Sequence, residues 1–231
     1  MGETAQSGIS RTRRWLICFG LVLGTFACAL DETMVATTIA ATGEELGDTK
    51  LLDWTNRSYI LTSTACQLLY GKLSDVFGRK RVLLVALGNF AAGSLLQMVA
   101  KNMWMVVVAR CVAGVGMSGL ITLPYMVIAD QMPLNERGAY YGVVGSAYAL
   151  SNVVGPVVGG WIVDRFSWRW TFSISTLAAS FALAVIVVLV PKDKNIVTKN
   201  VLMMLRWARN NFLSFWASDG DFVPQLGRQR L

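Results

Sequence analysis

Six apolar runs, each long enough to cross a lipid bilayer, constrain this chain more than any other feature of its sequence. A helix needs about 20 apolar residues to span a hydrocarbon core of roughly 30 Å. We expect helices at about 15–42, 54–73, 82–100, 103–129, 139–163 and 170–190. Of the 231 residues, 54% are hydrophobic and 15% are charged, an apolarity that soluble domains rarely reach. The sequence therefore predicts an all-α integral membrane protein with six transmembrane helices.

The positions of the cationic residues indicate how these helices cross the membrane, because cytoplasmic loops carry an excess of Lys and Arg. One set of loops holds Arg11, Arg13, Arg14, Lys72, Arg79, Lys80, Arg81, Arg137, Lys192 and Lys194, and the opposite set holds Lys50, Arg57, Lys101, Arg165 and Arg169. We therefore expect both termini in the cytoplasm, with a basic arm at 1–14, the six-helix bundle at 15–191 and a tail at 192–231. The net charge of +7 follows from this topology and does not indicate a nucleic-acid partner.

The sequence lacks the residue patterns that most enzymes and metal sites need. It contains no His, which removes imidazole as a metal ligand or proton carrier. Its cysteines lie apart in the apolar runs without the spacing of a metal site, and we expect all of them to be free: Cys18, Cys28, Cys66 and Cys111. No nucleophile motif is present. We therefore expect no enzymatic activity, no metal and no cofactor.

Two adjacent carboxylates, Asp31 and Glu32, interrupt the first apolar run. A charge inside the membrane costs on the order of 3 kcal/mol or more, so each carboxylate needs a partner or a water-filled cavity. Adjacent helical residues point about 100° apart, so the two cannot share one environment. The alternative is a position near the outer interface, where both carboxylates face water.

Arg110 in the fourth run supplies the opposite charge at a compatible depth. We expect Asp31 about 15 Å below the outer end of its helix and Arg110 about 10 Å below the end of its own, which allows a pair or a shared water site. A carboxylate whose proton affinity changes as an arginine approaches or leaves meets the physical requirement for proton coupling. The alternative is a static ion pair that fixes helix packing.

The stretch between the second and third runs is the most specific pattern in the chain. We expect it to form a short cytoplasmic loop, with Gly71, Asp75, Gly78, Arg79 and Lys80. The segment 71–83 resembles the Gly-x-Leu-Ala-Asp-Arg-x-Gly-Arg-Lys-x-x-Leu loop of the major facilitator superfamily, with Ser74 in place of Ala and Val76 in place of the first Arg. The resemblance implies a gating loop that contacts a helix of a second bundle, with Asp75 near the N-terminus of that helix.

The first and fourth runs resemble further motifs of this superfamily. Leu30-Asp31-Glu32-Thr33-Met34-Val35 is similar to Leu-Asp-x-Thr-Ile-Val of the fourteen-helix drug:proton antiporters, although Ala40 stands where Pro is usual. The segment 110–116 is similar to Arg-x-x-Gln-Gly-x-Gly, with Ala113 in place of Gln. These resemblances imply a proton-linked role for Asp31 and Arg110. Segments 133–138 and 168–170 resemble fungal members of the same branch.

The fifth run contains a stripe of small residues. Ser151, Gly155 and Gly159 recur every four residues, which permits close approach of another helix. Pro156 lacks an N–H and allows a kink. The segment ending at Gly160 resembles the Gly-x-x-x-Gly-Pro-x-x-Gly-Gly motif of facilitator antiporters, with Ser151 for the first Gly. The resemblance implies export by exchange.

An internal repeat predicts how the helices are related. Gly71-x-x-x-Asp75-x-Phe77 recurs as Gly160-x-x-x-Asp164-x-Phe166 three spans later, and hence on the opposite membrane face. Two inverted three-helix repeats require this arrangement. The repeat supports the fold that the resemblance implies, the six-helix N-terminal bundle of a major facilitator.

Facilitators of this branch have twelve or fourteen helices in two bundles, with the substrate between them, whereas this sequence predicts one bundle. The expected partners are the lipid bilayer, a small organic substrate, protons, and either a missing C-terminal bundle or another copy. The expected function is proton-coupled antiport of the multidrug-efflux type, in the plasma or vacuolar membrane. Two alternatives stay open: a vacuolar transporter of basic amino acids, and a truncated membrane fragment that does not transport.

The tail allows two interpretations. Apolar residues recur at helical spacing, at Val201, Leu205, Ala208, Phe212 and Phe215. An amphipathic helix on the membrane surface and a disordered tail fit this pattern equally. Residues 219–231 resemble nothing in the family, which favours a truncated or misread gene product.

Overall fold

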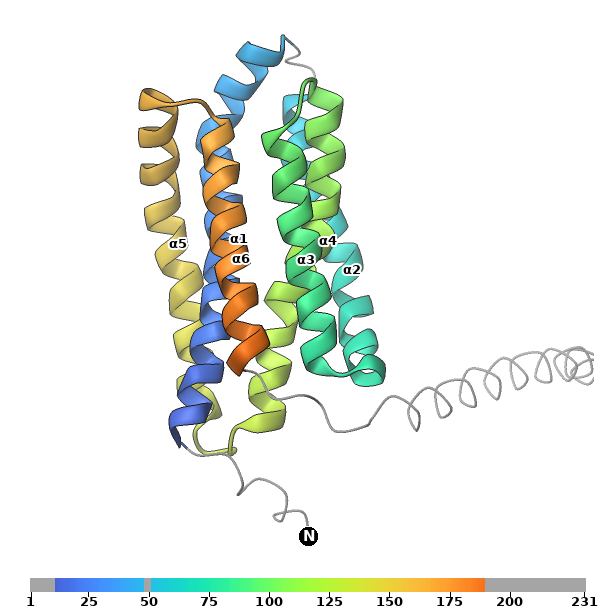
Figure 1. Cartoon of the computed structure of the whole chain (residues 1–231), viewed down its shortest axis with the longest axis vertical. Coiled ribbons are helices and arrows are strands. Elements are labelled where there is room, and N and C mark those ends of the chain that lie inside the picture. Colours follow the sequence, from blue (N-terminus) through green and yellow to red (C-terminus); the bar gives the residue numbers. More distant parts are fainter. Residues whose placement is uncertain (1–10, 48–50, 190–231) are drawn as a thin grey trace, which may run out of the picture.

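The computed structural model describes residues 11–47 and 51–189, which form six helices joined by short turns (Figure 1). The helices are α1 Arg11–Leu46, α2 Leu52–Phe77, α3 Arg79–Met98, α4 Met103–Gln131, α5 Arg137–Arg165 and α6 Arg169–Leu189. The predicted all-α six-helix bundle is therefore confirmed. The tail at 192–231 and most of the basic arm lie outside the described residues, and α1 already begins at Arg11.

Five of these helices, all except α2, are long and apolar enough to cross a membrane. The 26 residues of α2 are long enough, but their polar side chains lower its hydropathy. The Ser and Thr hydroxyls of α2 nevertheless donate to backbone carbonyls three or four residues earlier, as Thr62 does to Ser58 O at 2.6 Å. Hydroxyls satisfied within their own helix can be buried at low cost, so the polarity of α2 is compatible with a place in the bundle.

The predicted loop between the second and third spans is mostly helical, which corrects its boundaries. We expected spans to end at 73 and begin at 82, but α2 continues to Phe77 and α3 begins at Arg79. Only Gly78 separates them, with φ 94° and ψ 144°. Glycine adopts this positive φ without the steric cost that a Cβ would add, so one residue suffices for the turn.

The packing of the six helices is symmetric under an exchange of the two halves of the chain. α1 packs against α5 and α6, and α4 packs against α2 and α3. α3 contacts α6, and α1 contacts α4. Exchanging α1 with α4, α2 with α5 and α3 with α6 leaves this set of contacts unchanged, and α1 and α4 run in opposite directions (Figure 1). The two inverted three-helix repeats predicted from the sequence are therefore present.

Glycines in α3 and α4 allow these helices to approach closely. A Cβ on Gly116 would lie 2.4 Å from Phe90 N, and one on Gly93 would lie 2.4 Å from Ala113 N. A Cβ on Gly114 would lie 2.6 Å from Tyr59 O of α2. Because backbone atoms form these contacts, they fix the position of α4 and thereby the place of Arg110, one turn before Gly114.

Both ends of the described chain lie at the same end of the bundle (Figure 1). This follows from an even number of helices that alternate in direction. The turn between α2 and α3 and the turn between α4 and α5 lie at this end, and the turns between α3 and α4 and between α5 and α6 lie at the opposite end. Which end faces the cytoplasm stays a prediction.

Candidate functional site

Asp31 of α1 and Arg110 of α4 form a buried ion pair. Arg110 Nη1 donates to Asp31 Oδ2 at 2.6 Å. The side chain of Asp31 is 0% exposed and that of Arg110 is 1% exposed. Arg110 lies seven residues after the start of α4, or about 10 Å along the helix. The structure thus brings the two predicted residues together, and Asp31 does not face water at the interface. The pair also joins the two inverted repeats, because α1 belongs to one and α4 to the other.

Two aromatic rings hold the guanidinium of Arg110. Its Cζ lies 5.0 Å from the centre of the Tyr59 ring in α2 and 5.3 Å from that of Phe172 in α6. These distances are within the range of cation–π attraction, which is strongest where water is excluded. Four helices therefore contribute to the surroundings of one charge. Sequence reasoning missed both rings, since an aromatic residue in an apolar run carries no distinguishing signal.

Several polar atoms around this pair have no hydrogen-bond partner among the described residues. They are Asp31 Oδ1, Tyr59 OH, Arg110 Nε and Arg110 Nη2. Each is buried, and an unsatisfied buried donor or acceptor costs about 1–3 kcal/mol. The pair therefore retains the capacity to bind water, a proton or a polar ligand group at these atoms.

The small residues of α5 pack against the turn of α1 that follows Asp31. A Cβ on Gly155 would lie 1.8 Å from Thr33 Oγ1, and one on Gly159 would lie 2.5 Å from Thr37 Oγ1. Ser151 takes part through hydrogen bonds, because Thr33 Oγ1 donates to Ser151 O at 3.1 Å and Ser151 Oγ donates to Phe26 O at 3.3 Å. The stripe thus couples the position of α5 to that of α1.

The two remaining members of the predicted antiporter motif have different surroundings. Apart from the adjoining backbone of α5, no atom of residues 11–47 and 51–189 lies within 4 Å of a Cβ built on Gly160, so this glycine does not make a close contact between the described helices. Pro156 lies inside α5, which continues past it to Arg165.

Ion pairs between residues of this one bundle close the turn between α2 and α3. Arg79 binds Asp75 at 2.6 Å and Asp130 of α4 at 2.8 Å, and it also contacts Ser74. Lys80 Nζ donates to Val187 O at 2.7 Å, near the end of α6. Gly71 lies against Met126, whose Cε is 3.3 Å from a Cβ built there. Asp130 is a partner that sequence reasoning missed.

The sequence profile of the Major Facilitator Superfamily matches residues 21–210. The chain belongs to the major facilitator superfamily. It is therefore a multi-pass integral membrane protein of a transporter family, whose members are not enzymes, as the sequence predicted.

Similar facilitators include both exporters and importers. The efflux pump aflT of Aspergillus parasiticus is 37% identical over 204 residues, which is 87% of this chain and 40% of the pump. The vacuolar membrane amino acid uptake transporter fnx2 of Schizosaccharomyces pombe is 37% identical over 154 residues, 67% of this chain and 27% of that protein. The human organic anion transporter MFSD10 (TETRAN) has the same fold, with a TM-score of 0.68 at 17% identity over 81% of this chain and 50% of its own. The chain spans half or less of each.

At the end of this facilitator bundle opposite to Gly78, an ionic contact joins α6 to α1. Glu45 accepts a hydrogen bond from Trp168 Nε1 at 2.7 Å and binds the guanidinium of Arg169. Arg169 Nη2 also donates to Ala100 O at 2.9 Å, beyond the end of α3. Sequence reasoning missed this contact, although the repeat of Asp75 as Asp164 was a signal that equivalent turns occur at both ends.

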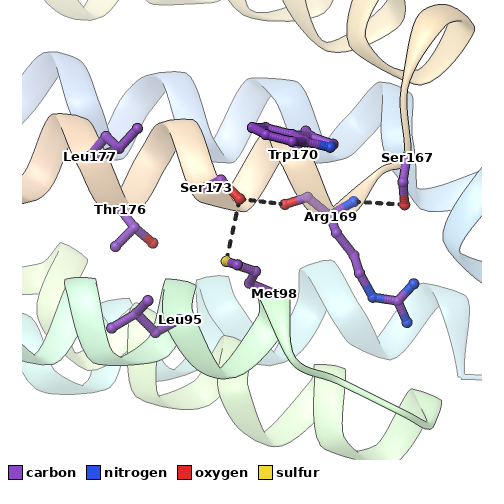
Figure 2. A pocket seen from close by; sticks show the side chains of 8 residues that line it. All are labelled: Leu95, Met98, Ser167, Arg169, Trp170, Ser173, Thr176 and Leu177. Carbon is purple, nitrogen blue, oxygen red and sulfur yellow. Dashed lines mark hydrogen bonds between the residues drawn. The ribbon is translucent and has the colours of Figure 1, made fainter.

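A groove of about 530 Å³ lies next to this contact, between α3 and the start of α6 (Figure 2). It is lined by Leu95, Met98, Ser167, Arg169, Trp170, Ser173, Thr176 and Leu177. Ser173 Oγ contacts Met98 Sδ at 3.3 Å and donates to Arg169 O at 3.2 Å, so its hydroxyl is already engaged. Most of the surface that lines the groove is apolar. Neither member of the Asp31–Arg110 pair lines this groove.

Proposed function

We propose that this bundle is the N-terminal half of a proton-coupled antiporter that exports small organic molecules, with Asp31 and Arg110 carrying the coupling. The observation that carries the proposal is the buried Asp31–Arg110 pair, whose carboxylate and guanidinium both keep unpartnered polar atoms. A pair built only to fix the packing gains little, because desolvating two charges offsets their attraction. Hydrogen-bond donors and acceptors that a buried ion pair does not use fit a site whose side chains bind different partners in different states of the transporter.

The proposed coupling follows from the electrostatics of the pair. An ionised Asp31 attracts Arg110, whereas a protonated Asp31 has no charge to hold it. Arg110 then remains attracted to the rings of Tyr59 and Phe172 and retains free donors at Nε and Nη2. Since the pair joins α1 to α4, proton binding weakens a link between the two inverted repeats. A proton can thereby shift the balance between two arrangements of the helices.

The small residues of α5 connect the proposed proton coupling to antiport. Thr33 and Thr37 of α1 pack into Gly155 and Gly159, so a displacement of α1 is transmitted to α5. The similarity to efflux pumps such as aflT supports export as the direction. The substrate of a facilitator binds between two bundles, so we propose that a second bundle, from a longer product or another copy, completes the site.

A vacuolar transporter of amino acids is the second candidate. The similarity to fnx2, named as a vacuolar membrane amino acid uptake transporter, favours it. Efflux from whole cells and uptake into isolated vacuoles distinguish the two functions, since an exporter at the cell surface lowers the cellular content of its substrate. A fragment that does not transport gives no signal in either assay and co-purifies with a longer relative.

The coupling itself is tested in proteoliposomes loaded with the pH-sensitive dye pyranine. We expect a panel that includes neutral chloramphenicol and cationic tetraphenylphosphonium to contain compounds whose addition moves protons in the wild type. Asp31→Asn should abolish this proton movement, whereas Asp53→Asn should preserve it, since Asp53 is an exposed acid whose ion pair within the described residues is with Arg57 on the surface of α2. Proton movement that is equal in the wild type and in Asp31→Asn would contradict the proposed coupling.

A further inference from the structure

Glu32 follows Asp31 in α1 but has different partners. The hydroxyl of Tyr148 in α5 donates to Glu32 Oε2 at 2.7 Å, and both side chains are only partly buried. Arg110 balances the charge of Asp31, whereas no Lys or Arg of residues 11–47 and 51–189 forms an ion pair with Glu32. The negative charge of Glu32 is therefore not compensated by the described part of the bundle.

The depth of Glu32 makes this charge informative. The next residue, Thr33, packs against Gly155, which lies ten residues before the end of α5. That separation corresponds to about 15 Å along the helix. Glu32 thus lies well inside the bundle and away from the helix ends. A carboxylate at such a depth does not face lipid, because its charge would be unsolvated there, so the face of α1 that carries Glu32 borders a water-filled space.

The local geometry leaves one oxygen of this carboxylate available. Tyr148 holds Oε2, and Oε1 has no hydrogen-bond partner within the described segments. The aromatic ring of Tyr148 adjoins the same carboxylate. A fixed anion beside an aromatic side chain attracts an organic cation by ion pairing, and the ring face adds cation–π attraction to a cation that lies over it.

We propose that Glu32 and Tyr148 form a recognition site for the positively charged group of a substrate, such as an organic ammonium or phosphonium ion. The proposal rests on the proposed transport function, since it names the class of substrate. The two adjacent carboxylates then have different tasks. Asp31 either binds a proton or forms the salt bridge with Arg110, and Glu32 binds the substrate cation on the face of α1 that borders the water-filled space. A basic amino acid and an apolar organic cation share this chemistry.

Binding of tetraphenylphosphonium to the purified full chain in lipid nanodiscs tests the site, with uncharged triphenylphosphine oxide as the matched probe. We expect the wild type to bind the phosphonium and Glu32→Gln to bind it about tenfold more weakly or worse, as the loss of a partly desolvated charge contact implies. Tyr148→Phe, which keeps the charge but frees Oε2, should weaken binding by about threefold. Glu44→Gln, the same change at an exposed position near the end of α1, should leave binding unchanged.

The outcomes separate the site from its alternatives. Competition by arginine identifies a basic amino acid as the natural cation, and competition by quaternary amines alone identifies an apolar cation; both support the site. Failure of the wild type to bind the phosphonium, equal affinities in the wild type and both variants, or an equal loss for the uncharged probe would each overturn it. The last result would indicate a packing defect.

A different measurement decides the proposed function. Proton movement with neutral chloramphenicol should disappear in Asp31→Asn and survive in the surface control Asp53→Asn. If Asp31→Asn behaves as expected while Glu32→Gln keeps its phosphonium affinity, coupling stands and the cation site is wrong. If Glu32→Gln loses affinity while Asp31→Asn moves protons normally, the cation site stands without the proposed coupling.

Discussion

Arg79, the first residue of α3, and Arg169, the first residue of α6, occupy equivalent places at opposite ends of the bundle. Each binds a carboxylate one residue before the last of a partner helix: Asp130 for Arg79 and Glu45 for Arg169. The symmetry that relates α1 to α4 and α3 to α6 therefore also relates the Arg79–Asp130 contact to the Arg169–Glu45 contact. The inverted repeat thus extends from the helix arrangement to single ion pairs.

The Arg169 contact should contribute measurably to stability. Arg169→Ala removes the bonds to Glu45 and Ala100 and the stacking on Trp168, where Cζ lies 4.5 Å from the ring centre. Because these groups are partly exposed, we expect a loss of about 1 kcal/mol in the free energy of unfolding. Thermal unfolding in detergent measures it. Arg57→Ala, which breaks an exposed pair within α2, is the control and should change stability by about 0.5 kcal/mol or less.

Removing one member of the buried pair should cost more than removing both. Arg110→Gln leaves Asp31 as an unpaired buried charge, which we expect to destabilise the bundle by about 3–5 kcal/mol. Adding Asp31→Asn removes that charge and should restore most of the loss. Unfolding by a denaturing detergent measures both proteins. A double variant as unstable as the sum of the two single variants would contradict an energetic coupling between these residues.

Gly155→Ala should disrupt the contact between α1 and α5. The new methyl group would overlap Thr33 Oγ1 and Cβ, at 1.8 and 2.7 Å, so the helices must separate. We expect a destabilisation of about 1–3 kcal/mol. The matched control is Gly160→Ala on the same helix, where no atom of another described helix lies within 4 Å of the new Cβ. This control should be neutral or stabilising, since Ala favours the helix by about 0.5–1 kcal/mol. Equal effects at the two positions would show that the close contact is absent.

Gly78→Ala should strain the turn between α2 and α3. The φ of 94° disfavours any residue with a Cβ, and we expect a cost of about 1–2 kcal/mol. Gly88→Ala lies inside α3, where no atom of another described helix is within 4 Å of the new Cβ; it provides the control and should not destabilise the bundle. Thermal unfolding of the two variants side by side decides the prediction, which fails if Gly78→Ala is as stable as the wild type.

The orientation in the membrane can be tested at two turns. Leu134, 79% exposed between α4 and α5, and Lys101, exposed between α3 and α4, lie at opposite ends of the bundle. If both termini are cytoplasmic, a membrane-impermeable maleimide should label Lys101→Cys in intact cells and Leu134→Cys only after permeabilisation. The native chain, with its four free cysteines, gives the background. The reverse pattern would invert the topology.

The long apolar runs were sufficient to predict the number and order of the helices, but not their ends. Lys72, Arg79 and Arg81 suggested a loop, yet they belong to α2 and α3. Long cationic side chains at the membrane edge can extend their charges to water from a helix, so charge alone does not end a helix there. The turn depends instead on the positive φ of Gly78, which only the backbone reveals.

The meeting of Asp31 and Arg110 was predictable because opposite charges at similar depth in apolar runs have few other partners. The contact of Glu32 with Tyr148 was not, since it depends on how far α5 is displaced along α1. That displacement is set by the fit of Thr33 into Gly155. Periodicity in a single helix contains no information about such a fit between two helices.

The single residue between α2 and α3 has a mechanical consequence. Gly78 is the only residue between the two helices, and Arg79 at the start of α3 binds Asp75 of α2 across the turn and Asp130 of the neighbouring α4. We therefore expect a tilt of α2 to move the start of α3 with it, so that the two helices act as one mechanical unit at this end of the bundle.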